Sequence, residues 1–172
     1  GQEFTVQQQQ WWDSVTALLI DAALAQEKVF VHRDFMPRNL MYSQPNPGLI
    51  DFQDAVVGPL SYDVISLFKD AFISWPEDKV QRLLGQYWRS AKEHGIQVPH
   101  DFLQFQRDCD LMGLQRHLKV IGIFARIYHR DGKPRYLADA PRFFDYIDTV
   151  LERYPELIEL RYLLDSLPIK GR

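Results

Sequence analysis

Apolar residues recur at intervals of three and four along most of the chain, and this period predicts a mainly helical protein. Near the N-terminus, Trp11, Val15, Leu18 and Ala22 follow this spacing, so an amphipathic helix is expected there. Further helices follow the same pattern after residue 58. The predicted helices cover residues 6–26, 59–72, 76–94, 101–128, 139–154 and 155–165.

Three short runs instead have the β-branched and apolar composition of strands: residues 28–31, 40–42 and 48–52. The segment Gln-Pro-Asn-Pro-Gly at 44–48 joins the last two and is typical of a hairpin turn. The sequence shows no internal repeat and no linker long enough to divide the chain. It therefore predicts a mainly α fold that carries one small β-hairpin, in a single domain over residues 1–172.

Composition narrows the possible classes of protein. The 172 residues are 46% hydrophobic and 13% aromatic, enough to bury a real core. A net charge of -3 argues against a nucleic-acid partner, which would require a basic surface. No apolar run approaches the ~20 residues that span a bilayer, and we expect no export, because residues 1–4 resemble neither the basic nor the apolar part of a signal peptide. Cys109 is the single cysteine and cannot form an internal disulfide, so we expect an inert core thiol and a cytoplasmic protein. Because no apolar run is long enough to span a bilayer, we expect no membrane partner.

One stretch carries candidate chemistry. The run from Val29 to Asn39 places His32, Asp34 and Asn39 at H-x-D-x-x-x-x-N spacing, and Asp51 ends the apolar strand that follows. Phosphoryl transfer from Mg-ATP needs a carboxylate that orients the attacking hydroxyl and accepts its proton, with amide and carboxylate oxygens for the metal. We therefore predict that Asp34 is catalytic, that Asn39 and Asp51 bind the metal, and that ATP and Mg²⁺ are the cofactors.

Each of these residues has an ordinary alternative explanation. Asp and Asn in tight loops commonly cap and turn the backbone, and a lone His is usually a packed side chain. The complete set of residues, in a strand–loop–strand context, favours the chemical interpretation. Within it, His32 is interpreted as an architectural residue that braces the loop by hydrogen bonding and does not titrate in the reaction.

This constellation resembles the catalytic segment of the kinase-like phosphotransferases. Met36 stands where protein kinases carry a Lys two residues after the catalytic Asp, and Asp51-Phe52-Gln53 replaces their D-F-G. Both differences move the resemblance toward the aminoglycoside phosphotransferase and choline kinase family, whose members phosphorylate small hydroxylated molecules.

The segment from Gly58 to Asp63 is similar to the G-P-x-x-x-D segment of that family. The resemblance implies that Asp63 braces the catalytic loop from the start of the next helix. An ordinary first-turn Asp, favoured by the helix dipole, is a compatible alternative.

Residues 115–128 and 130–143 look like the bacterial anomeric kinases of N-acetylmuramate and N-acetylglucosamine, which phosphorylate the C1 hydroxyl of the sugar in cell-wall recycling. The resemblance implies a sugar acceptor. A basic stripe along this helix is either a solvated face or part of an acceptor pocket, in which Arg could clamp a carboxylate such as the lactyl group. The candidate substrate-binding residues are Arg116, His117, Lys119 and Arg130.

A kinase-like fold also needs a β-rich lobe with a phosphate-covering loop and a Lys that pairs with the phosphates. Only 28 residues precede Val29, and they are predicted to be helical. We therefore expect the C-terminal lobe of the protein-kinase-like fold, whose partner is the N-terminal lobe of the same protein and which alone transfers phosphate negligibly. The alternatives are an aminoglycoside- or choline-type phosphotransferase and a non-catalytic kinase-like binding module.

Overall fold

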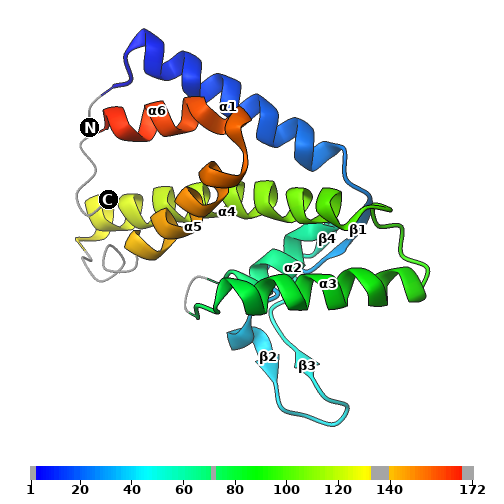
Figure 1. The fold of residues 1–172 in the computed structure, drawn as a ribbon. Helices are drawn as coiled ribbons and strands as arrows, with labels where there is room; N and C mark the ends of the chain where they lie inside the picture. The colour runs from blue at the N-terminus through cyan, green and yellow to red at the C-terminus, as the bar shows by residue number, and fades with distance from the viewer. Residues whose placement is uncertain (1–2, 71–72, 133–139, 168–172) are drawn as a thin grey trace. The chain divides into compact units, whose positions relative to one another are not determined.

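The computed structural model describes residues 3–70, 73–132 and 140–167 and is mainly helical (Figure 1). The strands are β1 (Lys28–Val31), β2 (Leu40–Met41), β3 (Gly48–Leu49) and β4 (Val56–Pro59). The helices are α1 (Val6–Leu24), α2 (Ser61–Phe68), α3 (Glu77–Glu93), α4 (Phe102–Asp131), α5 (Ala140–Arg153) and α6 (Ile158–Ser166), with short 3-10 turns η1 (Pro37–Asn39) and η3 (Pro155–Leu157).

The prediction of a mainly α fold with a small hairpin is confirmed. Two predicted helices, 59–72 and 139–154, extend into positions 71–72 and 139, which lie outside the described residues. Among the residues that the structure describes, no helix is both long and apolar enough to span a bilayer.

The strands form two antiparallel pairs, β1 with β4 and β2 with β3. The β2–β3 hairpin was predicted, but β4 was missed, and the prediction that a helix starts at residue 59 is wrong because α2 starts at Ser61. Gly58 and Pro59 weaken the strand signal of β4. Gly58 permits close packing of the pair, since an added Cβ would lie 3.3 Å from a methyl carbon of Val31.

The chain divides into two compact units, and each is described by itself. The first contains the chain up to Ala22 and from Leu114 onward, and the second runs from Ala23 to Gly113. The core of the second unit is formed by α2, α3 and the start of α4, and includes Leu60, Val64, Ile65, Val80, Leu84, Phe105 and Cys109. Burial raises the pKa of Cys109 well above its usual value, so this thiol stays protonated, as expected of a core residue.

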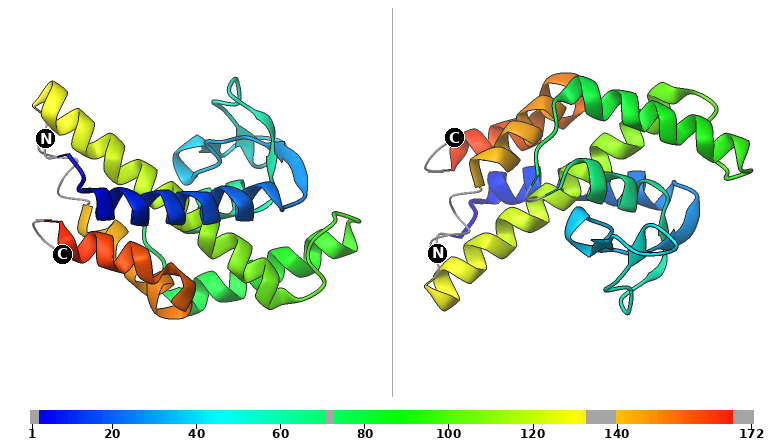
Figure 2. Two further views of the ribbon diagram at one scale, coloured as in Figure 1. Left: turned by 90° about the horizontal axis from the view of Figure 1, so that it is seen from above. Right: turned by 90° about the horizontal axis from the view of Figure 1, so that it is seen from below.

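In the first unit, α1 lies beside α6 (Figures 1 and 2). The ring of Trp11 stands 5.8 Å from that of Tyr162, and the side-chain amide of Gln8 donates to the hydroxyl of Ser166 at 2.9 Å. Val15 and Leu19 are buried on α1, which confirms the predicted amphipathic helix. Buried apolar residues of α5, η3 and α6 complete this core: Phe143, Ile147, Val150, Leu157, Leu160 and Leu163.

Helix α3 ends in a Schellman motif. Gly95 adopts a left-handed φ of 74°, and its N–H donates to the carbonyl of Lys92 at 3.1 Å. The N–H of Ile96 donates to the carbonyl of Ala91 at 2.9 Å. Two carbonyls at the end of the helix are thereby satisfied, and the chain can reverse only because glycine tolerates this backbone conformation.

We expect alanine at two glycines to change stability in opposite directions. At both Gly95 and Gly122 an added Cβ would meet nothing within 4 Å, so only backbone conformation matters. Gly95→Ala should cost about 1–2 kcal/mol in the free energy of unfolding because of its positive φ. Gly122→Ala, inside α4, should add roughly 1 kcal/mol. Urea unfolding followed by circular dichroism measures both, and changes of the same sign would contradict this account.

A buried ion pair also lies in the second unit. Lys69 follows α2, its side chain is 1% exposed, and its Nζ stands 3.4 Å from Oδ1 of Asp110 and 3.8 Å from Oε2 of Glu77. Asp110 is fully buried on α4. The sequence analysis gave no sign of this pair, because nothing in the pattern indicates that a lysine at the end of a helix turns into the core.

Breaking this pair should be costly. Lys69→Met removes the ammonium partner of the fully buried Asp110 carboxylate, so we expect a loss of about 3–5 kcal/mol in the free energy of unfolding. The double variant Lys69→Met/Asp110→Leu should recover most of it. As a control, Arg82→Met removes the exposed pair with Asp78 (73% and 76% exposed) and should cost less than about 1 kcal/mol. Equal losses in Lys69→Met and Arg82→Met, measured by urea unfolding, would refute the prediction.

Candidate functional site

The loop after β1 and the hairpin that follows bring three of the predicted site residues together. Asn39 lies in η1, and its side-chain Nδ2 donates to the backbone carbonyl of Asp34 at 2.9 Å. The same nitrogen donates to Oδ2 of Asp51 at 3.3 Å. One amide therefore connects the loop that carries Asp34 to the segment that carries Asp51.

Backbone pairing explains why residues so far apart in the sequence meet. The pairing of Leu40 with Leu49 in the β2–β3 ladder is extended by a bond from the N–H of Ile50 to the carbonyl of Asn39 at 3.2 Å. This bond places Asp51 next to Asn39. The predicted strand 48–52 is too long, because β3 ends at Leu49. Asp51 lies beyond the strand and has a left-handed φ of 69°, a value that a β-strand residue does not adopt.

The donor set of Asn39 and Asp51 fits Mg²⁺. With Nδ2 of Asn39 engaged, its Oδ1 accepts no hydrogen bond from the described residues. Mg²⁺ prefers such hard oxygens and needs only one or two carboxylates, because it keeps water and substrate phosphates as further ligands. The described part of the chain holds no cluster of three or more His, Cys, Asp or Glu suited to a metal.

Asp34 is half-buried, and its carboxylate accepts no hydrogen bond from the residues that the structure describes. Its backbone carbonyl is engaged instead, by the N–H of Met36 at 2.9 Å and by Asn39. The main chain of Asp34 is thus fixed while its carboxylate remains available to a hydroxyl group. Its catalytic role stays a prediction.

Asp63, in the first turn of α2, holds the loop through its carboxylate. Its Oδ2 accepts from the N–H of His32 at 2.6 Å, and its Oδ1 accepts from the N–H of Arg33 at 3.0 Å. Arg33 has a left-handed φ of 75°, a conformation in which successive N–H groups can converge on one anion. Arg33 and Asp51 are the two non-glycine residues with positive φ in the described chain, so both lie at this site.

His32 differs from expectation in one respect. Its ring is 3% exposed, and neither ring nitrogen has a hydrogen-bond partner among the described residues. The ring packs edge-on against Phe35 at a centroid distance of 6.1 Å. The predicted bracing by a side-chain hydrogen bond is therefore not formed. The main-chain N–H of His32 makes the bond instead, and the ring fills space behind the loop.

Two residues at this site were missed. The side-chain amide of Gln53 donates to Oδ1 of Asp51 at 3.0 Å, and Arg33 supplies both the left-handed turn and a bond from Nη1 to the carbonyl of Asp54 at 3.4 Å. The unusual Asp51-Phe52-Gln53 sequence could have indicated Gln53. No sequence signal indicates that an arginine adopts positive φ, because its neighbours impose that conformation.

A small pocket of about 140 Å³ lies behind the loop, with Phe35, Asp63 and Tyr87 among its lining residues. Burial raises the pKa of Tyr87, and the negative charge of Asp63 adds to this effect. The phenol therefore stays protonated next to the residue that anchors the loop.

The four candidate substrate-binding residues belong to the first unit and differ in exposure. Arg116 is 7% exposed and His117 is 1% exposed, its ring stacked on Tyr146 at 4.9 Å. Lys119 is exposed. Arg130 is also exposed and bonds both carboxylate oxygens of Asp131, at 2.6 and 2.9 Å. The stripe is thus neither wholly solvated nor wholly buried, and its part in acceptor binding stays a prediction.

Comparison with known proteins adds three relatives. The chain is 61% identical over 172 residues, its whole length, to the N-acetylmuramate/N-acetylglucosamine kinase of Pseudomonas putida, of which it covers 51%. It is 62% identical over 91% of its length to the kinase of that name from Pseudomonas aeruginosa, covering 46% of it, and 50% identical over 97% to that of Neisseria meningitidis, covering 50%. The chain thus spans about half the length of the curated relatives it matches.

A family model gives the broader assignment. The model of the phosphotransferase enzyme family matches residues 2–100. The matched region contains the whole of the loop, the hairpin and the Asp63 anchor. Since this match extends over more than half of the 172 residues, the chain belongs to the phosphotransferase enzyme family.

Proposed function

We propose that this chain is the catalytic-loop lobe, the C-terminal lobe of a protein-kinase-like fold, of an ATP-dependent kinase that phosphorylates the C1 hydroxyl of N-acetylmuramate or N-acetylglucosamine. The observation that carries the proposal is that the loop after β1 and the two ends of the hairpin bring Asp34, Asn39 and Asp51 together. The names of the relatives support the choice of acceptor.

In this mechanism Asp34 accepts a hydrogen bond from the acceptor hydroxyl and takes its proton as the new O–P bond forms, while the bond from the γ-phosphorus to the bridging oxygen of ATP breaks and ADP leaves. In a loose transition state the rate depends more on the position of the proton acceptor than on its basicity, so an ordinary carboxylate is sufficient. Asn39, through Oδ1, and Asp51 would hold Mg²⁺, which neutralises phosphate charge when bound. Asp63 does not touch the reacting atoms and acts as a positioning residue through the backbone of His32 and Arg33.

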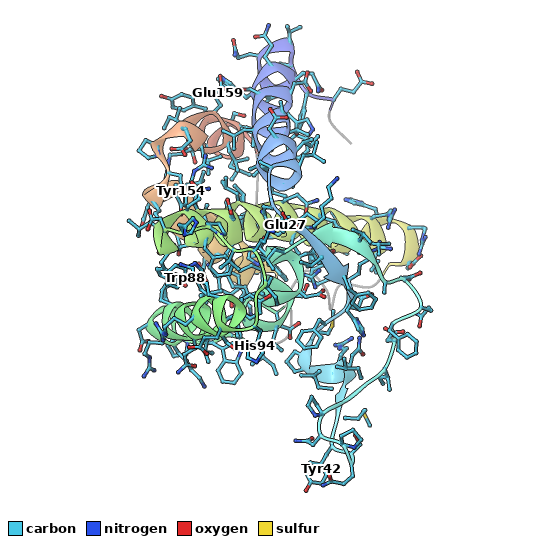
Figure 3. All side chains as sticks on the ribbon, turned by 90° about the vertical axis from the view of Figure 1, so that its right-hand side faces the viewer. Glu27, Tyr42, Trp88, His94, Tyr154 and Glu159 are labelled. Carbon is cyan, nitrogen blue, oxygen red and sulfur yellow. The ribbon has the colours of Figure 1, made fainter. Side chains whose placement is uncertain are left out.

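Large apolar side chains on the hairpin and on the strands β1 and β4 are exposed, which supports a further lobe. Scattered exposed apolar residues are ordinary, but a run of them along neighbouring strands is typical of a covered surface. Tyr42, 91% exposed, stands at the tip of the β2–β3 hairpin (Figure 3). The other exposed members are Phe30, Met41, Leu49, Ile50, Phe52, Val56 and Val57. In the proposed enzyme ATP and the N-terminal lobe of the same protein cover exposed side chains of this group.

The basic residues Arg116, Lys119 and Arg130 are proposed, from the resemblance to the sugar kinases, as candidates for binding a carboxylate of the acceptor. An aminoglycoside or choline acceptor would carry positive charge and would be repelled by such a lining. The acceptor assay described next distinguishes these classes.

Asp34→Asn in the full-length protein should lower kcat by about 10²–10⁴-fold with little change in the KM for sugar, because it removes the proton acceptor. The measurement is ADP release with N-acetylmuramate, N-acetylglucosamine, choline and an aminoglycoside as acceptors. It tests both the role of Asp34 and the class of acceptor. Asp54→Asn, an exposed aspartate in the same hairpin region, is the matched control and should keep activity. Turnover with choline or the aminoglycoside but with neither sugar would contradict the proposal, and so would full activity of Asp34→Asn.

Asp63→Asn should loosen the loop. Hydrogen bonds to charged groups contribute about 1.5–3 kcal/mol each, and the amide that replaces the carboxylate turns an N–H toward one of the two backbone donors. We expect at least tenfold lower kcat and faster hydrogen exchange at the amides of His32 and Arg33. Asp78→Asn, which removes an equal charge from an exposed site on α3, should change neither. Unchanged exchange in Asp63→Asn would show that the carboxylate does not hold the loop.

A further inference from the structure

The side chain of Gln53 binds the carboxylate of Asp51 but has no part in the mechanism proposed above. Its Nε2 donates to Oδ1 of Asp51 at 3.0 Å, and Nδ2 of Asn39 donates to Oδ2 at 3.3 Å. Two amides from different segments therefore bind the same carboxylate, one at each oxygen. Among the described residues, the Asp51 carboxylate accepts no other hydrogen bond.

A tight turn fixes the backbone of Gln53. The N–H of Ala55 donates to the carbonyl of Phe52 at 3.1 Å, so Gln53 and Asp54 are the two central residues of a β-turn. Nη1 of Arg33 donates to the carbonyl of Asp54 at 3.4 Å and connects this turn to the loop after β1. The backbone that carries Gln53 is thus held by hydrogen bonds that do not involve its own side chain.

Two donors on one carboxylate define its orientation. The χ2 torsion of an aspartate is broad and roughly two-fold, so a carboxylate with a single partner can rotate and exchange its oxygens. With one amide at each oxygen of Asp51, the plane of the carboxylate is defined before any ligand binds. A carboxylate has about four lone-pair sites, so each oxygen still has a lone pair for a further partner.

We propose that Gln53 is a positioning residue that makes the metal site selective for Mg²⁺ over Ca²⁺. This inference rests on the proposed function, in which Asp51 is a metal ligand. Mg²⁺ requires near-ideal octahedral geometry, whereas Ca²⁺ accepts flexible coordination and binds carboxylates through one or both oxygens. A carboxylate of fixed orientation, with a hydrogen bond at each oxygen, favours the ion that needs one well-placed oxygen. Without the Gln53 amide, the Asp51 carboxylate can rotate and present both oxygens.

The residue type at this position matters because an amide is a donor without charge. Gln53 orients Asp51 and leaves the full negative charge of the carboxylate to the metal. A lysine or arginine would also donate, but its positive charge would oppose the binding of a cation. A glycine, as in the D-F-G sequence of protein kinases, has no side chain that could donate.

The test is metal binding by the full-length protein in the presence of a non-hydrolysable ATP analogue. Bound Mn²⁺ is measured by electron paramagnetic resonance, and Mg²⁺ and Ca²⁺ are titrated as competitors, so this readout does not depend on turnover. We expect Gln53→Met to weaken Mg²⁺ binding about 10–100-fold and to leave Ca²⁺ binding nearly unchanged. Gln53 is exposed, so the variant opens no cavity in the core.

Kinetics should show the same selectivity. In Gln53→Met the apparent KM for Mg²⁺ should rise by a similar factor, while kcat at saturating Mg²⁺ stays near the wild-type value. A variant that only disturbed the fold of the loop would lower kcat at every Mg²⁺ concentration, and that result would contradict the inference.

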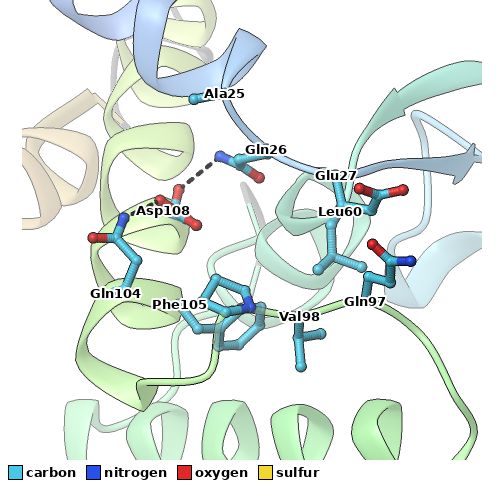
Figure 4. Close-up of a pocket in the computed structure, with 10 residues that line it drawn as sticks. Ala25, Gln26, Glu27, Leu60, Gln97, Val98, Gln104, Phe105 and Asp108 are labelled. Carbon is cyan, nitrogen blue, oxygen red and sulfur yellow. Dashed lines mark hydrogen bonds between the residues drawn. The ribbon is translucent and has the colours of Figure 1, made fainter.

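Gln104→Met is the matched control, because it removes the same kind of bond from another place. Nε2 of Gln104 donates to Oδ1 of Asp108 at 2.8 Å, and both residues line a separate pocket of about 310 Å³ (Figure 4). This variant should change the affinity for neither ion.

The outcomes separate this inference from the proposed function. If Asp51→Asn binds Mn²⁺ as the wild type does, Asp51 is not a metal ligand, and the proposed function and the inference are both wrong on this point. If Asp51→Asn loses Mn²⁺ but Gln53→Met keeps the wild-type ratio of Mg²⁺ to Ca²⁺ affinity, only the inference is wrong. The same conclusion follows if Gln104→Met lowers this ratio as much as Gln53→Met does.

Discussion

The carboxylate of Asp63 is the constraint on which the rest of the site depends. It accepts hydrogen bonds from the main-chain N–H groups of two successive residues, His32 and Arg33, and so compensates for the left-handed backbone of Arg33. The direction in which the chain leaves β1 is set there. The following loop then carries Asp34 to Asn39, and Asn39 in turn holds Asp51. An anion in a helix first turn thus fixes a catalytic loop by backbone contacts alone.

In Asp34 and Asn39, one polar group holds the loop in place and a different polar group is available for the proposed chemistry. Asp34 is held by its carbonyl, which leaves its carboxylate available, and Asn39 is held by its amide nitrogen, which leaves its oxygen available. His32 contributes its N–H to the anchor and its ring to packing. Mutations that change these side chains therefore alter both positioning and chemistry, whereas changes at Asp63 alter positioning alone.

Much of the site could be predicted because its residues are close in sequence or joined by a short hairpin. The H-x-D-x-x-x-x-N spacing and the turn at 44–48 were sufficient to place Asp34, Asn39 and Asp51 together. The left-handed Arg33, the unbonded ring of His32 and the position of Asp51 beyond its strand could not be predicted. Each results from a balance of local hydrogen bonds that residue type does not specify.

The sequence by itself determined the helical class, the β2–β3 hairpin and the family, and it supplied the candidate site residues. Periodicity, turn residues and motif spacing are local properties, so they can be read from one segment at a time. The tertiary structure alone decided the pairing of β1 with β4, the burial of Lys69 against Asp110 and the hold of Asp63 on the loop after β1. These depend on contacts between distant segments, and the free energy of such contacts exists only once the chain has folded.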